Sequence, residues 1–249
     1  MTLSAIVITK NEEIAIRRCL ESVAWADEIV VVDSGSTDRT VGICEELGAK
    51  VHSAADWPGF GAQKNRALDL AHGDWVLSLD ADEWLSPGLQ SEIRATVNGP
   101  TEDYEAYRIP RLSSFCGKFM RHSGWWPDRV LRLFRRGRAR FSDDLVHERL
   151  IVQGSVGALS QLMLHESFAS LEEVLDKINR YSSAGAQMML AEGRAGSLTS
   201  AVAHGAWTFI RTYFLKAGFM DGREGFMLSV SNAEGVYYRY LKAGLLGKR

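Results

Sequence analysis

Two aspartates separated by a single residue, Asp80 and Asp82, directly follow the apolar run of residues 75–79. At the point where a buried strand ends, carboxylates at this spacing can share a hard divalent cation. Mg²⁺ and Mn²⁺ prefer such oxygen ligands and are usually held jointly with substrate phosphates. The alternative is that the carboxylates cap the next helix, but Ser86 and Pro87 already supply a cap and a first helical residue. The spacing therefore predicts a divalent-metal site for Mg²⁺ or Mn²⁺.

Asp33 ends another apolar run and is followed by a Ser-Gly-Ser-Thr turn. One interpretation is an Asx turn or helix cap, which contributes about 1 kcal/mol to stability. The other is a carboxylate that accepts hydrogen bonds from a base or a ribose. Thr9 and Glu12, near the end of the first apolar run, carry the same two interpretations. Because Asp80 and Asp82 also follow a strand-like run, we favour the binding interpretation.

Strand-like and helix-like segments alternate through the first hundred residues and must position these side chains. Short apolar runs, typical of buried parallel strands, occupy residues 3–8, 28–33 and 75–79, and residues 50–53 resemble a further short strand. Amphipathic segments lie between them, the first with Asn11 as its predicted N-cap. This alternation predicts βαβ units and a mostly parallel sheet, whose carboxyl edge is the usual ligand site. Thr9, Asp33 and Asp80 all fall at that edge.

After Pro100 the pattern changes to shorter strand-like pieces and then to helices. The strand-like pieces cover residues 104–110, 130–134 and 145–152, and helical periodicity follows at 171–178 and 201–216. A break at residues 192–196 separates the two helical stretches. The sequence thus predicts an α/β domain over residues 1–168 and a helical extension over residues 169–249.

The net charge of −2 conceals a strong asymmetry along the 249 residues. Residues 1–107 carry 8 Lys and Arg against 19 Asp and Glu, whereas residues 108–140 carry nine Arg and one Lys against one Asp. Part of this basic block is a solvated face, and part suits phosphates on a donor or acceptor, because Arg contacts them bidentately. Trp125 and Trp126 would suit stacking on sugar rings. The acidic first hundred residues and the lack of a nucleic-acid motif exclude nucleic acid as the partner.

The composition also indicates a compartment. No apolar run reaches the about 18–20 residues that a membrane span needs, and the first residues are too polar for a signal peptide. Cys19, Cys44 and Cys116 are odd in number and show no CxxC spacing, which argues against disulfides and structural zinc. We therefore expect a soluble protein of a reducing compartment, without a transmembrane segment.

Four motifs in order carry a resemblance to a known family. They are IVITKNE at 6–12, IVVVDSGSTD at 29–38, QKNRA at 63–67 and GDWVLSLDADE at 73–83. In them the chain resembles the family 2 glycosyltransferases with the GT-A fold. WPDRVLRLFR at 126–135, VHE at 146–148 and GFMDG at 218–222 resemble the branch of lipopolysaccharide inner-core β-1,4-glucosyltransferases.

That resemblance implies roles for individual residues. Thr9, Glu12 and Asp33 would hold the uridine of a nucleotide sugar, with Lys64 beside the nucleotide. Asp80 would contact ribose or sugar, and Asp82 would bind the metal that bridges the diphosphate. Residues 1–100 would form the nucleotide-binding half and residues 101–168 the acceptor-side half.

Inverting transfer also requires a base that takes a proton from the acceptor hydroxyl. The candidates downstream of Asp82 are Asp128, Asp143, Asp144 and Glu148. We favour Glu148, which lies on a strand-like segment that would aim it rigidly, and place Asp128 second. His147 is a candidate metal ligand, and His165 is a weaker one.

The last fifty residues are aromatic and basic, with seven Lys and Arg against three Asp and Glu. They predict either a helix–helix core or a surface for anionic lipid. The resemblance implies transfer of a hexose, glucose from UDP-glucose, to a heptose of a phosphorylated glycolipid at the inner face of the bacterial inner membrane.

Other functions stay open. The same chemistry suits a polyprenyl phosphate, another glycan or a peptide as acceptor. A nucleotide-sugar-binding module without turnover is less favoured, because both aspartates and a downstream carboxylate are present. A nucleotidyltransferase would need a Gly-rich loop near the N-terminus, which the sequence lacks.

Overall fold

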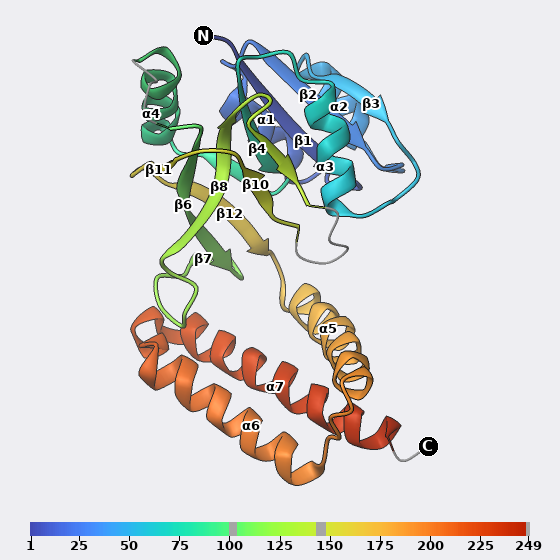
Figure 1. Ribbon diagram of the computed structural model, residues 1–249. Coiled ribbons are helices and arrows are strands. Elements are labelled where there is room, and N and C mark those ends of the chain that lie inside the picture. Colours follow the sequence, from blue (N-terminus) through green and yellow to red (C-terminus); the bar gives the residue numbers. More distant parts are fainter. Residues whose placement is uncertain (100–103, 143–147, 248–249) are drawn as a thin grey trace. The chain divides into compact units, whose positions relative to one another are not determined.

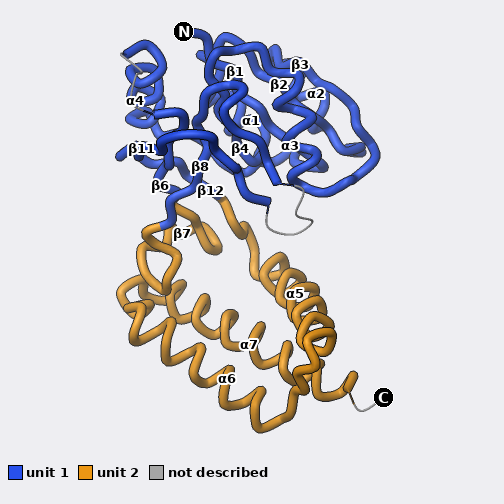
Figure 2. Tube along the Cα trace, viewed as in Figure 1, with its two compact units in different colours: residues 1–111, 128–165 blue, residues 112–127, 166–249 orange. Residues whose placement is uncertain are grey.

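The computed structural model describes residues 1–99, 104–142 and 148–247. The chain divides into two compact units, coloured separately in Figure 2. The first unit comprises residues 1–111 and 128–165, and the second comprises residues 112–127 and 166–249. The boundaries fall within two strands, β6 (Ala106–Phe115) and β12 (Met163–Phe168).

Four parallel strands form the centre of the first unit (Figure 1). These are β1 (Leu3–Thr9), β2 (Glu28–Asp33), β3 (Lys50–Ser53) and β4 (Trp75–Asp80). β1 pairs with both β2 and β4, and β2 pairs with β3. All seven residues of β1 are buried, as expected for a strand covered on both faces. The predicted parallel sheet is thus confirmed.

Helices cover both faces of this sheet. The connections are α1 (Ile16–Val23), α2 (Thr40–Glu46) and α3 (Phe60–Asp69). Because side chains alternate along a strand, one face of β1 packs against α1 and α2, and the other packs against α3. The two apolar clusters fix the register of β1, since a slip by one residue would exchange its faces.

The remaining strands extend the sheet with mostly antiparallel pairs. Among the described residues the strand order is β3-β2-β1-β4-β8-β6-β12-β5, with β7 and β11 both paired to β6. The further elements are β5 (Glu83–Leu85), α4 (Pro87–Asn98), β7 (Lys118–Phe119), β8 (Asp128–Arg135), β9 (Ala139–Phe141), β10 (Leu150–Val152) and β11 (Val156–Ala158). β9 and β10 form a separate antiparallel hairpin. Ser86 caps α4, with Pro87 as its first residue, as the sequence predicted.

The second unit is mainly helical. It contains α5 (Leu171–Ala191), α6 (Leu198–Ile210), the π-helix η1 (Arg211–Leu215), the 3₁₀-helix η2 (Gly218–Asp221) and α7 (Gly222–Leu246). The predicted break at residues 192–196 lies between α5 and α6. Ser170 and Ser197 cap the two helices that they precede. In the described part of the chain, every helix is too short or too polar to cross a bilayer.

The predicted N-cap at Asn11 is wrong. α1 begins five residues later, at Ile16, and has no side-chain cap. Asn11 instead adopts a left-handed backbone with φ of 56°, and its Oδ1 accepts a hydrogen bond of 2.8 Å from the backbone N–H of Thr37. Asn tolerates this conformation better than most residues. The residue therefore ties the loop after β1 to the loop after β2.

Glu28 joins three segments at the other end of the sheet. Its carboxylate accepts hydrogen bonds from Ser4 Oγ at 2.6 Å, Lys50 Nζ at 2.8 Å and the backbone N–H of His72 at 2.9 Å. Burial by itself would raise the pKa of this carboxyl, but the hydrogen bonds lower the pKa from 4.5 to about 2. The charged form therefore stabilises the fold above pH 4.5.

We predict that Glu28→Gln lowers the free energy of unfolding by about 1–3 kcal/mol at pH 7. The difference from the unsubstituted protein should disappear as pH falls from 4.5 toward 2, because the native carboxylate then becomes protonated. Urea denaturation across this range measures both effects. Glu21→Gln, at an exposed carboxylate, is the control, and an equal loss there would contradict the assignment.

Candidate active site

Three of the predicted site residues lie together at the carboxyl edge of the parallel sheet. In the strand register Thr9 is opposite Asp33, and Ile8 is opposite Asp80. The hydroxyl of Thr9 is buried and has no hydrogen-bond partner among the described residues. A buried hydroxyl without a partner is costly, so this atom is suited to a bound ligand.

Asp33 is engaged by its own turn. One carboxylate oxygen accepts hydrogen bonds of 2.9 Å from the backbone N–H groups of Gly35 and Ser36, and the other accepts one from the Ser36 hydroxyl. The Asx turn is therefore present. It fixes the orientation of the carboxylate at the sheet edge. Glu12 lies in the loop after β1, where its backbone N–H donates to Thr40 Oγ1 at 2.8 Å.

Lys64 links the aspartate motif to the favoured base. This buried residue of α3 places its Nζ 2.8 Å from Asp80 Oδ1 and 2.7 Å from Glu148 Oε1. Asp80 and Glu148 are far apart in sequence, and one ammonium group brings their carboxylates together. The prediction that Glu148 lies on a strand is wrong, because β10 begins at Leu150. Lys64, rather than a strand, holds its side chain.

Two residues that sequence reasoning missed complete this network. Arg132 of β8 donates from Nη2 to Asp80 Oδ2 at 2.5 Å and to Glu83 Oε1 at 2.7 Å. Glu83 is fully buried, and its other oxygen accepts the backbone N–H of Asp80 at 3.0 Å. An arginine within the apolar stretch of β8 was the available signal, because a buried guanidinium requires a carboxylate partner.

The charges of this network favour ionised Asp80. Burial would raise the pKa of its carboxyl, but Arg132 and then Lys64 hold that pKa well below its usual range. Burial acts in the opposite direction on Arg132, and the carboxylates of Asp80 and Glu83 outweigh it and raise the pKa of the guanidinium. Asp80 is thus a permanent anion held by two cations.

Asp128, the second base candidate, forms a separate pair. Arg111 donates to Asp128 Oδ2 from Nε at 2.9 Å and lies 2.8 Å from it through Nη2. Its remaining nitrogen, Nη1, contacts Glu83 Oε1 at 2.9 Å. Glu83 therefore receives both Arg111 and Arg132 on one oxygen.

Asp80 and Glu148 line a cavity of about 440 Å³. Its basic lining residues are Arg108, Arg111, Arg132 and Arg149, and its apolar ones are Val130, Leu131, Phe141 and Leu150. Part of the basic block thus gathers around the two carboxylates. The cavity pairs a cationic lining with carboxylates, which suits an anionic ligand and proton transfer.

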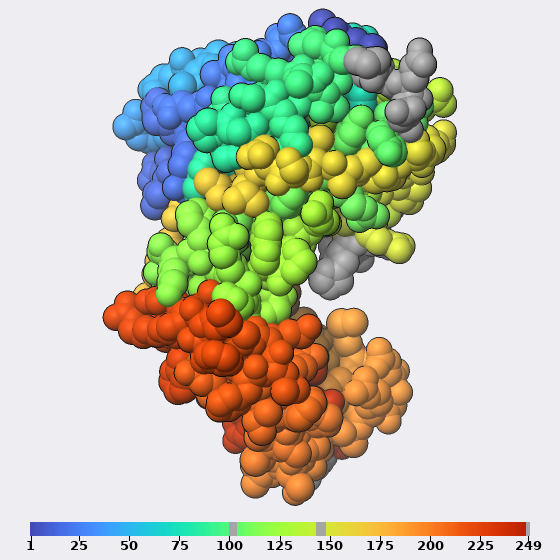
Figure 3. Space-filling view, turned by 90° about the vertical axis from the view of Figure 1, so that its left-hand side faces the viewer, coloured from blue at the N-terminus to red at the C-terminus, as the bar shows by residue number. Residues whose placement is uncertain are grey.

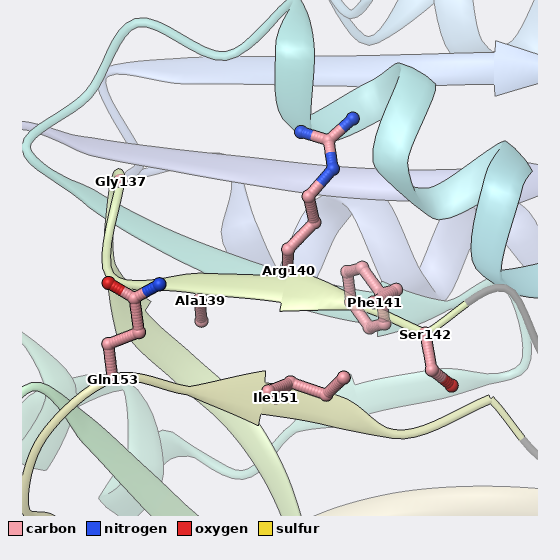
Figure 4. A pocket seen from close by; sticks show the side chains of 7 residues that line it. All are labelled: Gly137, Ala139, Arg140, Phe141, Ser142, Ile151 and Gln153. Carbon is pink, nitrogen blue, oxygen red and sulfur yellow. The ribbon is translucent and has the colours of Figure 1, made fainter.

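A second cavity, of about 470 Å³, lies beside the β9–β10 hairpin (Figure 4). In the figure Arg140 points away from the hairpin, toward α3, where it contacts Asp69 at 2.9 Å. Phe141 lines both cavities, but this one has no carboxylate in its lining. The chemistry therefore favours the cavity at Asp80.

His165 is the imidazole that lies at Asp82. Its Nε2 is 3.3 Å from Asp82 Oδ2. His147, the stronger candidate from the sequence, lies outside the described residues, as do Asp143 and Asp144. Within the described ranges, no three His, Cys, Asp or Glu side chains form a metal-binding group. Asp82 and His165 offer one oxygen and one nitrogen donor, and oxygens of a substrate would supply further ligands.

We predict that Glu83→Ala lowers the free energy of unfolding by about 3–5 kcal/mol, because it leaves two guanidinium groups without their buried partner. Urea denaturation measures the loss. Asp69→Ala, which removes the exposed partner of Arg140, should cost no more than about 1 kcal/mol. Equal effects of the two substitutions would show that Glu83 does not organise the site.

Comparisons with known proteins identify the family. The model of glycosyl transferase family 2 matches residues 4–151. The lipopolysaccharide core biosynthesis glycosyltransferase LpsC of Rhizobium meliloti is 30% identical over 100% of this chain and 93% of its own length. A glycosyltransferase of Rickettsia typhi is 33% identical over 96% of this chain and 86% of its own.

A solved structure shows the shared fold. Staphylococcus aureus TarS 1–349, in complex with UDP-GlcNAc, aligns with 100% of this chain and 93% of its own, with a TM-score of 0.51 and 16% identity. The predicted GT-A-type α/β fold is confirmed. From its motifs, its fold and its full-length relatives, the chain belongs to glycosyl transferase family 2.

Proposed function

We propose that this glycosyltransferase moves a hexose, glucose from UDP-glucose, onto a heptose of the lipopolysaccharide inner core, with inversion at the anomeric carbon. The reaction would take place at the cytoplasmic face of the bacterial inner membrane. The similarity to LpsC, a lipopolysaccharide core biosynthesis glycosyltransferase, extends over the whole chain and supports this acceptor class. The observation that carries the chemistry is that Lys64 joins Asp80 to Glu148, two carboxylates that line one cavity.

The donor would bind at the carboxyl edge of the parallel sheet. The buried hydroxyl of Thr9 has no hydrogen-bond partner among the described residues, Asp33 ends the neighbouring strand β2, and Glu12 lies on the loop after β1. These three residues would hold the uridine. Asp80 would accept a hydrogen bond from the ribose or sugar, and Lys64 would lie beside the nucleotide.

A divalent metal fits the remaining donors. Asp82 and His165 are both partly accessible and lie within 3.3 Å of each other, so they would hold Mg²⁺ or Mn²⁺ together with diphosphate oxygens. When bound, the ion would neutralise charge that develops on the departing diphosphate. Arg132 and Lys64 already neutralise Asp80, so that carboxylate would add little repulsion toward the diphosphate.

Glu148 would act as the base. It would take the proton of the acceptor hydroxyl as the hydroxyl oxygen bonds to the anomeric carbon and the bond from that carbon to the diphosphate breaks. The electron pair of the breaking bond leaves with the nucleoside diphosphate, and attack from the opposite side inverts the configuration. Both candidates contact a cation, Lys64 at Glu148 and Arg111 at Asp128, but of the two Glu148 is the one that lines the cavity with Asp80. This difference supports Glu148 over Asp128.

The arginines around the cavity would bind phosphates of the acceptor. Arg108 and Arg149 line it beside the two carboxylates. Guanidinium groups recognise phosphate with paired hydrogen bonds, and this supports a phosphorylated glycolipid as the partner.

We predict that Glu148→Gln lowers kcat by about 10²–10⁴-fold while donor affinity stays within about threefold. The amide oxygen can still accept a hydrogen bond from Lys64, but the amide cannot take the proton of the acceptor. Transfer assays with UDP-glucose and a heptose-terminated core acceptor measure kcat, and calorimetry with UDP measures affinity. Asp128→Asn is the matched comparison, with a smaller expected loss. Should Asp128→Asn abolish transfer and Glu148→Gln spare it, the two assignments would have to be exchanged.

We further predict that Asp82→Asn and His165→Asn each raise the Mn²⁺ concentration needed for half-maximal UDP binding by about tenfold or more. Thermal-shift titrations of Mn²⁺ at fixed UDP measure this requirement without turnover. His52→Asn, on β3, is the control and should behave as the unsubstituted protein. An unchanged Mn²⁺ requirement in both site variants would exclude this pair as the metal ligands.

A further inference from the structure

In the second unit, helix α6 carries its large apolar side chains on the outward face instead of the inward one. Toward the interior, α6 directs small residues, Ala201, Gly205 and Thr208. Outward it directs large apolar side chains: Leu198, Val202, Trp207 and Ile210 are exposed, and Phe214 and Leu215 of η1 continue the row. Trp207, the largest of these side chains, is 54% exposed. A helix that serves only its own core would show the opposite arrangement.

No charge interrupts α6. Its thirteen residues contain no Asp, Glu, Lys or Arg. Helices of surface domains normally carry charged residues on the outward face. The outward face of α6 is therefore suited to an apolar surrounding rather than to water.

The GFMDG motif adds a rigid apolar turn beside this helix. Gly218 and Asp221 are buried, whereas the two residues between them, Phe219 and Met220, are 52% and 62% exposed. The Asp221 carboxylate accepts the backbone N–H of His122 at 2.8 Å and contacts its Nδ1 at 2.9 Å.

Glycine is required next to that turn. A Cβ on Gly218 would lie 2.6 Å from Ser123 Oγ and 2.8 Å from the carbonyl oxygen of Thr212. The turn is thus held at both ends, by the close packing of Gly218 and by the hydrogen bonds of Asp221 to His122. The exposure of Phe219 and Met220 is imposed by the fold and is not a consequence of loose structure.

Basic side chains flank this apolar surface. Arg211, Lys216 and Arg223 are exposed. Between residues 193 and 223 Asp221 is the one acidic residue and is buried against His122, while Glu224, the next acidic residue, contacts Arg223 Nε at 3.0 Å. The exposed charge of the segment is therefore positive. Aromatic and aliphatic side chains interleaved with Lys and Arg are typical of surfaces that lie at the headgroup layer of an anionic membrane.

We propose that this docking face, formed by the outward side chains of α6, η1 and η2 with Arg211, Lys216 and Arg223, binds an anionic lipid bilayer. These segments make part of the orange-to-red surface in Figure 3. Phe219 and Met220 enter the boundary between headgroups and acyl chains, and the cations contact lipid phosphates. A second copy of the chain is a poorer partner, because a twofold interface would set the same cations against one another. The inference rests on the proposed function, in which the acceptor is a glycolipid.

Vesicle sedimentation of the full chain tests this face. The vesicles are phosphatidylcholine alone or phosphatidylcholine mixed with phosphatidylglycerol. Phe219→Ser/Met220→Ser should weaken binding to the anionic vesicles at least about tenfold, equivalent to about 1.4 kcal/mol. Lys216→Glu/Arg223→Glu should weaken it about fivefold or more for each charge and remove the preference for phosphatidylglycerol.

A matched control lies on α5. Leu175 and Met188 are 49% and 64% exposed, so Leu175→Ser/Met188→Ser removes as much exposed apolar surface elsewhere in the same unit. This variant should bind the vesicles as the unsubstituted chain does. Thermal unfolding checks that all variants fold, and Trp207→Ser provides a second test of the docking face.

Two results would overturn the proposal. One is equal vesicle binding by the docking and control variants. The other is that the unsubstituted chain does not bind vesicles but forms a dimer in solution that Phe219→Ser/Met220→Ser dissociates. The face would then be a self-association surface. Transfer to a delipidated core acceptor separates this inference from the proposed function, because the docking variant should keep that activity. Loss of transfer by every form, including the unsubstituted chain, would count against the proposed function alone.

Discussion

The carboxyl edge of the parallel sheet, where Asp80 lies, depends on one buried carboxylate, that of Glu83. Its two oxygens receive Arg111, Arg132 and the backbone N–H of Asp80, so three segments of the chain meet at a side chain that no solvent reaches. A buried ion of this kind is tolerated only when its partners are complete. That requirement fixes Arg132, and Arg132 in turn fixes Asp80. The carboxylate at the end of β4 is therefore positioned before any substrate arrives.

The same network accounts for the uneven charge along the chain. Two of the acidic residues from the first hundred positions, Asp80 and Glu83, lie at this edge, and strands β6 and β8 bring Arg111 and Arg132 to them. Cations from one part of the sequence thus neutralise anions from another, and the overall charge of −2 hides the pairing. In the second unit positive charge has a different setting, because exposed Arg211 and Lys216 lie in the same segment as the exposed side chains of Phe214, Leu215 and Phe219.

Local patterns predicted the parallel half of the fold well. The apolar runs predicted β1, β2 and β4, because a strand buried on both faces has few other sequence solutions. β3 was also predicted, although none of its residues is buried. The prediction of Ser86 and Pro87 at the start of α4 was correct because a helix cap depends on neighbouring residues alone. The prediction of Asn11 as an N-cap was wrong because its side chain bonds to the backbone of Thr37. Spacing along the chain does not reveal this partner.

The site was predicted in its residue types more than in its contacts. Asp80, Lys64 and Glu148 were each identified, but their shared ammonium contact depends on where α3 packs. The position of His165 beside Asp82 follows from the antiparallel pairing of β12 with β5, which the spacing of the two residues does not reveal. Arg132 and Glu83 were missed because a buried ion pair is recognised only when both partners are seen together.

The central claim is that this edge performs an inverting hexosyl transfer, and the anomeric configuration of the product tests it most directly. The chain is mixed with UDP-glucose, Mn²⁺ and a core acceptor that ends in heptose, and the product is examined by proton NMR spectroscopy. We predict one new β-linked hexose for each UDP released, because attack opposite the leaving group inverts the α-configured donor. An α-linked product, or UDP release without a new linkage, would contradict the account.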